Sequence, residues 1–187
     1  MRKLYVITGA SGSGKSTVLR ILKDKGYVVL EEQARKIIAQ ENKKPDGMSR
    51  DDPEFPLFLT QKQQEAEHGL PEKISFIDRG IIDSLAFLAI EDKQPSKKLL
   101  SLIKKAPYEK KVFFLSLPPK EVFGKSDHKH SEETYEPYER SLAFVNLLQQ
   151  AYTSQGYELF IVPFASFEEQ ANMIEEEVLK HKWVHKK

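Results

Sequence analysis

The sequence Gly9-Ala10-Ser11-Gly12-Ser13-Gly14-Lys15-Ser16 decides the fold, because it separates a short apolar run from a segment with helical periodicity. The apolar run, Leu4-Tyr5-Val6-Ile7, has the residue types of a buried parallel strand. Beyond Ser16, apolar residues recur at helical spacing, and Lys25-Gly26 supplies a basic last turn and a stop signal. We therefore expect a strand, a glycine-rich loop and a helix in direct succession.

The glycine-rich loop matches the Walker A pattern at every fixed position and lies in the strand-to-helix context that this motif requires. Its glycines let backbone N–H groups converge on an anion, and the start of the helix adds partial positive charge. We expect Lys15 to contact the β- and γ-phosphates and the Ser16 hydroxyl to bind Mg²⁺. The alternative is an ordinary turn rich in Gly and Ser. The predicted nucleotide-binding residues are Gly9, Ala10, Ser11, Gly12, Ser13, Gly14, Lys15, Ser16 and Thr17.

Length and composition restrict the class of protein. The 187 residues, 40% hydrophobic and 30% charged, suit a single globular domain over residues 1–187. A formal net charge of +1 provides no overall field for nucleic acid or a membrane, so we expect neither as a partner. There is no Cys, which excludes disulfides and thiolate metal sites. The segment before Gly9 is too short for a secretory signal, and no run approaches the roughly 18 apolar residues of a membrane span, so we expect a cytoplasmic protein.

Strand and helix patterns alternate along the rest of the chain. Further strands are expected at 27–30, 74–77, 111–115 and 157–162. Helices are expected at 31–40, 54–68, 82–90, from 134 or 137 to 155, and at 167–181. This alternation predicts an α/β fold, a three-layer α/β/α sandwich with a five-stranded parallel sheet, as in P-loop nucleoside and nucleotide kinases. The polar segment 120–133 is expected to form a lid.

A second motif, Asp78-Arg79-Gly80, follows the third expected strand, at the sheet edge where ligands gather in open α/β sheets. Asp78 is placed like a Walker B acid, which binds Mg²⁺ through water or accepts a proton from the attacking group. Arg79 can then hold a phosphoryl or acceptor oxygen. We expect Lys15, Asp78 and Arg79 to be catalytic, and Ser16 and Asp78 to be the metal ligands. The alternative is that Asp78 and Arg79 merely cap the next helix.

Charged residues after the second expected strand suggest an acceptor pocket at the same edge of the sheet. Glu32 and Arg35 are three residues apart, so their side chains can share a helix face. Asp83 lies four residues after Arg79 and has similar standing. The alternative for these charges is a solvated surface. In the expected lid, Lys125 and Lys129 are candidates to stabilise a transferring phosphoryl group.

These motifs together resemble an AAA-type P-loop family that includes the ribosylnicotinamide kinase domain of bacterial NAD regulators and, similar to it, animal translocation-defect GTP-binding proteins. The resemblance covers nearly the whole chain and implies that Glu32, Arg35, Arg79 and Asp83 line a pocket, with Phe164 and Ala165 near the nucleotide base. Where the family's lid is rich in arginine, this chain has Lys129 and His130. The segments on which the family resemblance rests are the Walker loop, Glu32-Gln33-Ala34-Arg35, residues 78–86, residues 115–119 and residues 156–163.

The sequence leaves three functions open. The leading hypothesis is a small-molecule kinase that uses Mg-ATP or Mg-GTP and phosphorylates a nucleoside-like or other small acceptor. A nucleotide-dependent switch or slow NTPase that acts on a partner is the second, although Asn42-Lys43-Lys44-Pro45-Asp46 has one residue too many for a guanine-reading motif. A nucleic-acid-processing ATPase is the third, and the sequence has no basic groove signal for it. The acceptor and the oligomeric state are not predicted.

Overall fold

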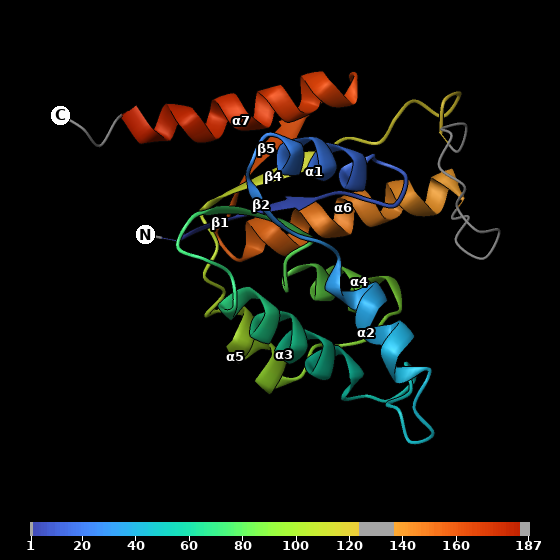
Figure 1. Cartoon of the computed structure of the whole chain (residues 1–187). Helices are drawn as coiled ribbons and strands as arrows, with labels where there is room; N and C mark the ends of the chain where they lie inside the picture. Colours follow the sequence, from blue (N-terminus) through green and yellow to red (C-terminus); the bar gives the residue numbers. More distant parts are fainter. Residues whose placement is uncertain (1, 124–136, 184–187) are drawn as a thin grey trace.

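Five strands form one parallel sheet at the centre of the computed structural model, which describes residues 2–123 and 137–183, with side chains up to residue 180 (Figure 1). Their order across the sheet is β2-β3-β1-β4-β5. Every neighbouring pair is parallel, which confirms the predicted sheet. The strands are β1 (Lys3–Thr8), β2 (Val28–Leu30), β3 (Ile74–Asp78), β4 (Lys111–Leu115) and β5 (Glu158–Val162).

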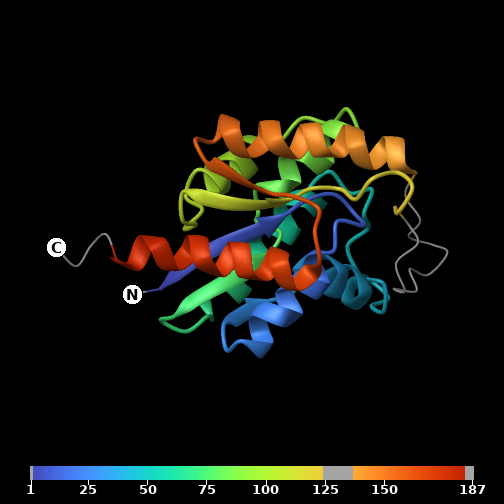
Figure 2. The same cartoon turned by 90° about the horizontal axis from the view of Figure 1, so that it is seen from above.

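Helices cover both faces of the sheet and give the three layers that the sequence predicts (Figures 1 and 2). One face carries α1 (Lys15–Asp24) and α7 (Phe167–Trp183). The other carries α6 (Tyr138–Ser154), with α3 (Phe55–His68), α4 (Asp83–Ile90) and α5 (Lys97–Ile103) beyond it. The remaining helix, α2 (Gln33–Glu41), contacts α3. None of the described helices combines the length and the apolar character needed to cross a membrane.

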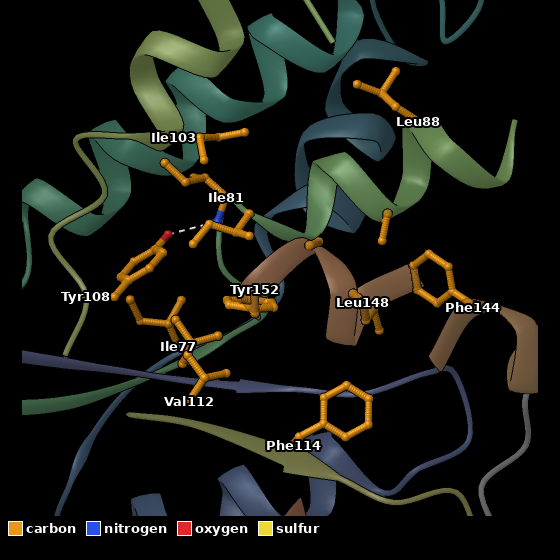
Figure 3. Packing of buried hydrophobic residues seen from close by; sticks show 14 of the residues in the cluster. Ile77, Ile81, Leu88, Ile103, Tyr108, Val112, Phe114, Phe144, Leu148 and Tyr152 are labelled. Atoms are coloured by element: carbon orange, nitrogen blue, oxygen red, sulfur yellow. Dashed lines mark hydrogen bonds between the residues drawn. The ribbon is translucent and has the colours of Figure 1, made fainter. Parts of the chain in front are cut away.

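Each face of the sheet has its own hydrophobic core because side chains alternate along the strands. In β1, Leu4 and Val6 face the helices around α6, whereas Tyr5 and Ile7 pack against α1 and α7. The first of these cores also surrounds the loop that follows β3. Figure 3 shows its members, among them Ile77, Ile81, Tyr108, Val112, Phe114, Phe144, Leu148 and Tyr152.

One helix was not predicted from the sequence, and most of the predicted lid lies outside the described residues. Helix α5 was not predicted, because it spans only seven residues and its apolar pattern is correspondingly short. Ser96 begins it by accepting the N–H of Leu99 at 3.2 Å, and Leu99 and Ile103 are buried one turn apart. Of the predicted lid, residues 120–123 form a turn. Residues 124–136 lie outside the described part of the chain, so the lid and its Lys125 and Lys129 stay predictions.

Candidate functional site

The loop from Gly9 to Gly14 leads directly from β1 into α1. Gly12 and Gly14 have φ angles of 80° and 86°, in the left-handed region that favours glycine. A Cβ atom on Gly14 would lie 2.5 Å from the ring of Phe167, so this position also lacks room for a side chain. Because α1 begins at Lys15 and Thr17 is the first residue whose N–H donates to the carbonyl of Gly14, at 3.1 Å, the N–H groups of Lys15 and Ser16 precede the hydrogen bonding of the helix. This geometry suits an anion.

Lys15 is buried against the loop that precedes it. Its Nζ donates to the carbonyl oxygens of Gly9 and Ala10, each at 2.9 Å, and lies 3.4 Å from Oγ of Ser13. Burial, and to a smaller extent the neighbouring Arg79 guanidinium, lower the pKa of Lys15 from 10.5 to about 7. The carboxylates of Asp78, Glu32 and Asp83 act in the opposite direction. The charges of Arg79, Asp78, Glu32 and Asp83 therefore all act on the ammonium group of Lys15.

Asp78 ends β3 beside the Walker loop, opposite Ile7 of β1. It is buried, and its Oδ1 has no hydrogen-bond partner within the described residues. Burial raises the pKa of Asp78, whereas Lys15 and Arg79 oppose this rise. An unpaired buried carboxylate oxygen is costly, and a hydrated cation would satisfy it.

Ser16 is exposed at the start of α1, and Oδ1 of Asp78 is unpaired in the described residues, so both predicted metal ligands have groups available for Mg²⁺. No three His, Asp or Glu side chains converge as metal ligands in residues 2–123 and 137–183.

Arg79 is held in a buried and strained position. Its φ of 65° is unusual for a residue with a side chain, and its N–H donates to the carbonyl of Ile7 at 3.0 Å. The guanidinium carbon lies 5.3 Å from the centre of the Phe87 ring and 5.9 Å from that of Phe144, close enough for cation–π attraction. Although burial acts against it, Asp83, Glu32 and Asp78 raise the pKa of Arg79. Arg79 is thus a fixed cation.

Asp83 fixes the guanidinium. Its Oδ2 accepts from Nη1 of Arg79 at 2.9 Å and from Oγ1 of Thr8 at 2.8 Å. The Tyr152 hydroxyl, from α6, donates to Oδ1 of the same carboxylate. We call these four residues, Thr8, Arg79, Asp83 and Tyr152, the Arg79 cluster. The sequence analysis expected Asp83 to contact acceptor, but the structure directs both of its oxygens into the cluster, so its role in an acceptor pocket stays a prediction.

Glu32 and Arg35 lie at the start of α2, beside the Arg79 cluster. The two side chains form an ion pair, with Arg35 Nε 3.0 Å from Glu32 Oε2. The other oxygen of Glu32 lies 4.0 Å from Nε of Arg79, an atom that is buried without a hydrogen bond in the described residues. The side chain of Arg35 is 63% exposed and that of Glu32 only 19%. Glu32 therefore connects a buried arginine to one at the surface.

Several residues that hold this arrangement were missed by the sequence analysis. Tyr108 accepts the N–H of Ile81 at 2.8 Å (Figure 3). Its hydroxyl also donates to Oε1 of buried Glu67 at 2.7 Å. Gln63 donates to the carbonyl of Arg79 at 2.8 Å. These tyrosine and glutamine side chains come from distant parts of the chain and follow no motif. The close approach of both Tyr108 and Tyr152 also explains Gly80, where a Cβ atom would lie 2.8 Å from each.

The chain resembles known proteins in family and in fold. A family model described as an AAA domain matches residues 4–170. No curated protein sequence gives a significant match. The structure is similar to thymidylate kinase from Ehrlichia chaffeensis, with a TM-score of 0.64 and 12% identity over 95% of this chain and 98% of that chain.

Two further solved structures have the same fold. Thymidylate kinase from Candida albicans gives a TM-score of 0.63 at 20% identity, over 96% of this chain and 92% of that one. Deoxyadenosine kinase from M. mycoides, solved with the products dCMP and dCDP bound, gives 0.62 at 16% identity, over 96% and 100%. At such low identities the likeness establishes a kinase-like P-loop fold and leaves the chemistry to the site.

Proposed function

The chain belongs to the AAA domain family, and on this premise we propose that it is a kinase that transfers the γ-phosphoryl group of Mg-ATP to a hydroxyl group of a nucleoside-like acceptor. The observation that carries the proposal is that Asp78, Arg79 and Asp83 adjoin Ile7 and Thr8 at the end of β1, directly before the Walker loop. Mg-GTP is the alternative donor. The narrower resemblance to ribosylnicotinamide kinases and a cytoplasmic location remain predictions.

The charge balance at the acceptor side favours a hydroxyl over a phosphate group as the acceptor. Arg79 is already paired with Asp83 at 2.9 Å, and Arg35 with Glu32 at 3.0 Å. A dianionic phosphate would have to compete with both carboxylates for these arginines. A neutral hydroxyl can instead donate to Glu32, whose side chain is mostly buried but not enclosed.

In this proposal each residue acts at a defined atom. The N–H groups of the Walker loop and Lys15 hold the phosphates. Glu32 accepts the proton as the acceptor oxygen forms its bond to the γ-phosphorus, and the bond from that phosphorus to the bridging oxygen breaks to release ADP. Arg79 stabilises the charge that spreads over the phosphoryl oxygens. Ser16 and Asp78 would hold Mg²⁺, which neutralises charge on the β- and γ-phosphates when bound.

The test is to incubate the protein with Mg-ATP or Mg-GTP and pooled nucleosides, nucleoside monophosphates, vitamins and phosphosugars. Mass spectrometry then detects any product heavier by one phosphoryl group. The matched variant is Glu32→Gln, which keeps the shape of the side chain but cannot accept the proton. We expect a product from an unphosphorylated hydroxyl compound, at least about 100-fold slower in Glu32→Gln with nucleotide binding retained.

Two outcomes would contradict the proposal. A product formed solely from monophosphates would exclude the hydroxyl acceptor while leaving a kinase. Hydrolysis of nucleotide with no phosphorylated product from any pool would instead support the nucleotide-dependent switch.

A further inference from the structure

Two buried tyrosines hold the loop between β3 and α4 in matching ways. The Tyr108 hydroxyl accepts the N–H of Ile81 at 2.8 Å, and the Tyr152 hydroxyl accepts the N–H of the preceding residue, Gly80, at 3.2 Å. Each hydroxyl also donates to a buried carboxylate, Tyr108 to Glu67 and Tyr152 to Asp83. The two side chains therefore make the same kinds of hydrogen bond to adjacent residues of one loop.

The two carboxylates differ in what they contact next. Glu67 accepts a further hydrogen bond from Gln63 at 3.0 Å. Asp83 binds the guanidinium of Arg79 at 2.9 Å. The Tyr108 branch thus reaches Arg79 at its backbone carbonyl, which accepts from Gln63 at 2.8 Å, whereas the Tyr152 branch reaches the guanidinium.

Helix α6 reaches the Arg79 side chain directly through Phe144 and indirectly, by way of Asp83, through Tyr152. Phe144 lies 5.9 Å from the guanidinium carbon, and Tyr152, two turns further along the helix, fixes the carboxylate that binds it. Both α6 residues are almost fully buried, at 3% and 0% exposure, so neither can move without repacking the core. The orientation of α6 is therefore transmitted to the side chain of Arg79.

We propose that Tyr152 is a positioning residue: its hydroxyl orients Asp83, which in turn aims Arg79 at the transferring phosphoryl group. The role in transfer depends on the proposed kinase function, whereas the orientation of Arg79 by Tyr152 does not. Without the hydroxyl, Oδ1 of Asp83 loses its donor, and the carboxylate can rotate away from the plane that holds Nη1 of Arg79. Tyr108 supports the same loop but is connected, through Glu67 and Gln63, only to the backbone carbonyl of Arg79 and not to its guanidinium.

The experiment compares Tyr152→Phe with Tyr108→Phe in the full chain. Each variant keeps its ring and loses one hydrogen bond to an amide and one to a carboxylate, so similar losses of thermal stability are expected. Activity is measured with the acceptor that the mass-spectrometry screen identifies. We expect Tyr152→Phe to lower kcat about tenfold with little change in KM for Mg-ATP, and Tyr108→Phe to change kcat by less than about twofold.

A second readout does not depend on activity. In ¹⁵N-arginine NMR spectra, the guanidinium signals of Arg79 are identified by their loss in Arg79→Lys. We expect them to shift and to exchange faster with solvent in Tyr152→Phe and to stay unchanged in Tyr108→Phe. If Tyr152→Phe does not fold, Thr8→Val removes the other hydroxyl bound to Asp83 and should move the same signals.

The outcomes separate this inference from the proposed function. Equal effects of the two Tyr→Phe variants on kcat and on the Arg79 signals would overturn the positioning role of Tyr152. Unchanged Arg79 signals in Thr8→Val would likewise overturn the connection through Asp83. If wild type phosphorylates no acceptor, the kinase proposal fails, while the NMR comparison still decides whether Tyr152 orients Arg79.

Discussion

The Walker loop and the Arg79 cluster lie at the same edge of the sheet but hold their functional groups by different means. The loop uses consecutive residues, and the groups that we expect to bind an anion are mostly backbone N–H groups at the start of α1. The cluster uses side chains from β1, the loop after β3, α4 and α6, and each is fixed by another side chain. A backbone cradle depends on the conformation that its glycines allow, whereas a cluster of this kind depends on the side chain of each of its members.

This difference predicts which property of the protein a substitution in each region should change. A substitution in the loop should act on nucleotide binding and leave the acceptor side intact. A substitution in or beside the cluster should act on transfer, and where the residue is buried it should also act on stability, because burial leaves the remaining partner unpaired. Three changes test this contrast, from the largest expected effect to the smallest.

Lys15→Ala should weaken Mg-ATP binding at least about 1000-fold, or about 4 kcal/mol, because Lys15 is the predicted cation for the β- and γ-phosphates. Calorimetry and thermal-shift titration measure the loss, and circular dichroism checks that the fold is kept. Lys23→Ala is the control, since Lys23 lies on the same helix with a 61% exposed side chain. Equal stabilisation of wild type and Lys15→Ala by ATP would remove the nucleotide site from this loop.

Arg35→Ala should slow phosphoryl transfer roughly tenfold, an increase in the barrier of about 1.4 kcal/mol, because Arg35 holds Glu32 by its 3.0 Å ion pair. Since the side chain of Arg35 is exposed, the free energy of unfolding should change by less than about 0.5 kcal/mol. The control is Lys36→Ala, which removes a similar exposed pair at 2.9 Å, to Glu31. If both variants transfer at the wild-type rate, Arg35 does not belong to the acceptor site.

The same contrast explains what the sequence could predict. The position of the Walker loop between β1 and α1 was predictable because its residues are contiguous and match one pattern, whereas its binding of phosphates stays a prediction. Arg79 and Asp83 were within reach because they are four residues apart at the end of a recognisable strand. Tyr152 was not, because it lies 69 residues beyond Asp83, in a helix whose apolar pattern predicts core packing for a tyrosine. The five strands followed from apolar runs, whereas seven-residue α5 was too short to show a period.

The smallest effect concerns pH and reports on both regions, because the Arg79 guanidinium helps to lower the pKa of the loop lysine. In the free protein the pKa of Lys15 is about 7, and a bound triphosphate should raise it toward 10.5, since a neighbouring anion favours the charged amine. Between these two values the complex carries a proton that the free protein lacks. Affinity for Mg-ATP should therefore fall as pH rises, roughly fivefold from pH 7 to 8, with uptake of about one proton per nucleotide at pH 8. Calorimetry in two buffers of different ionisation enthalpy measures this uptake, and Lys15→Arg, which stays charged, should show none. A wild-type protein that binds Mg-ATP at pH 8 without proton uptake would mean that Lys15 is already charged in the free protein, and that the carboxylates outweigh burial and Arg79 there.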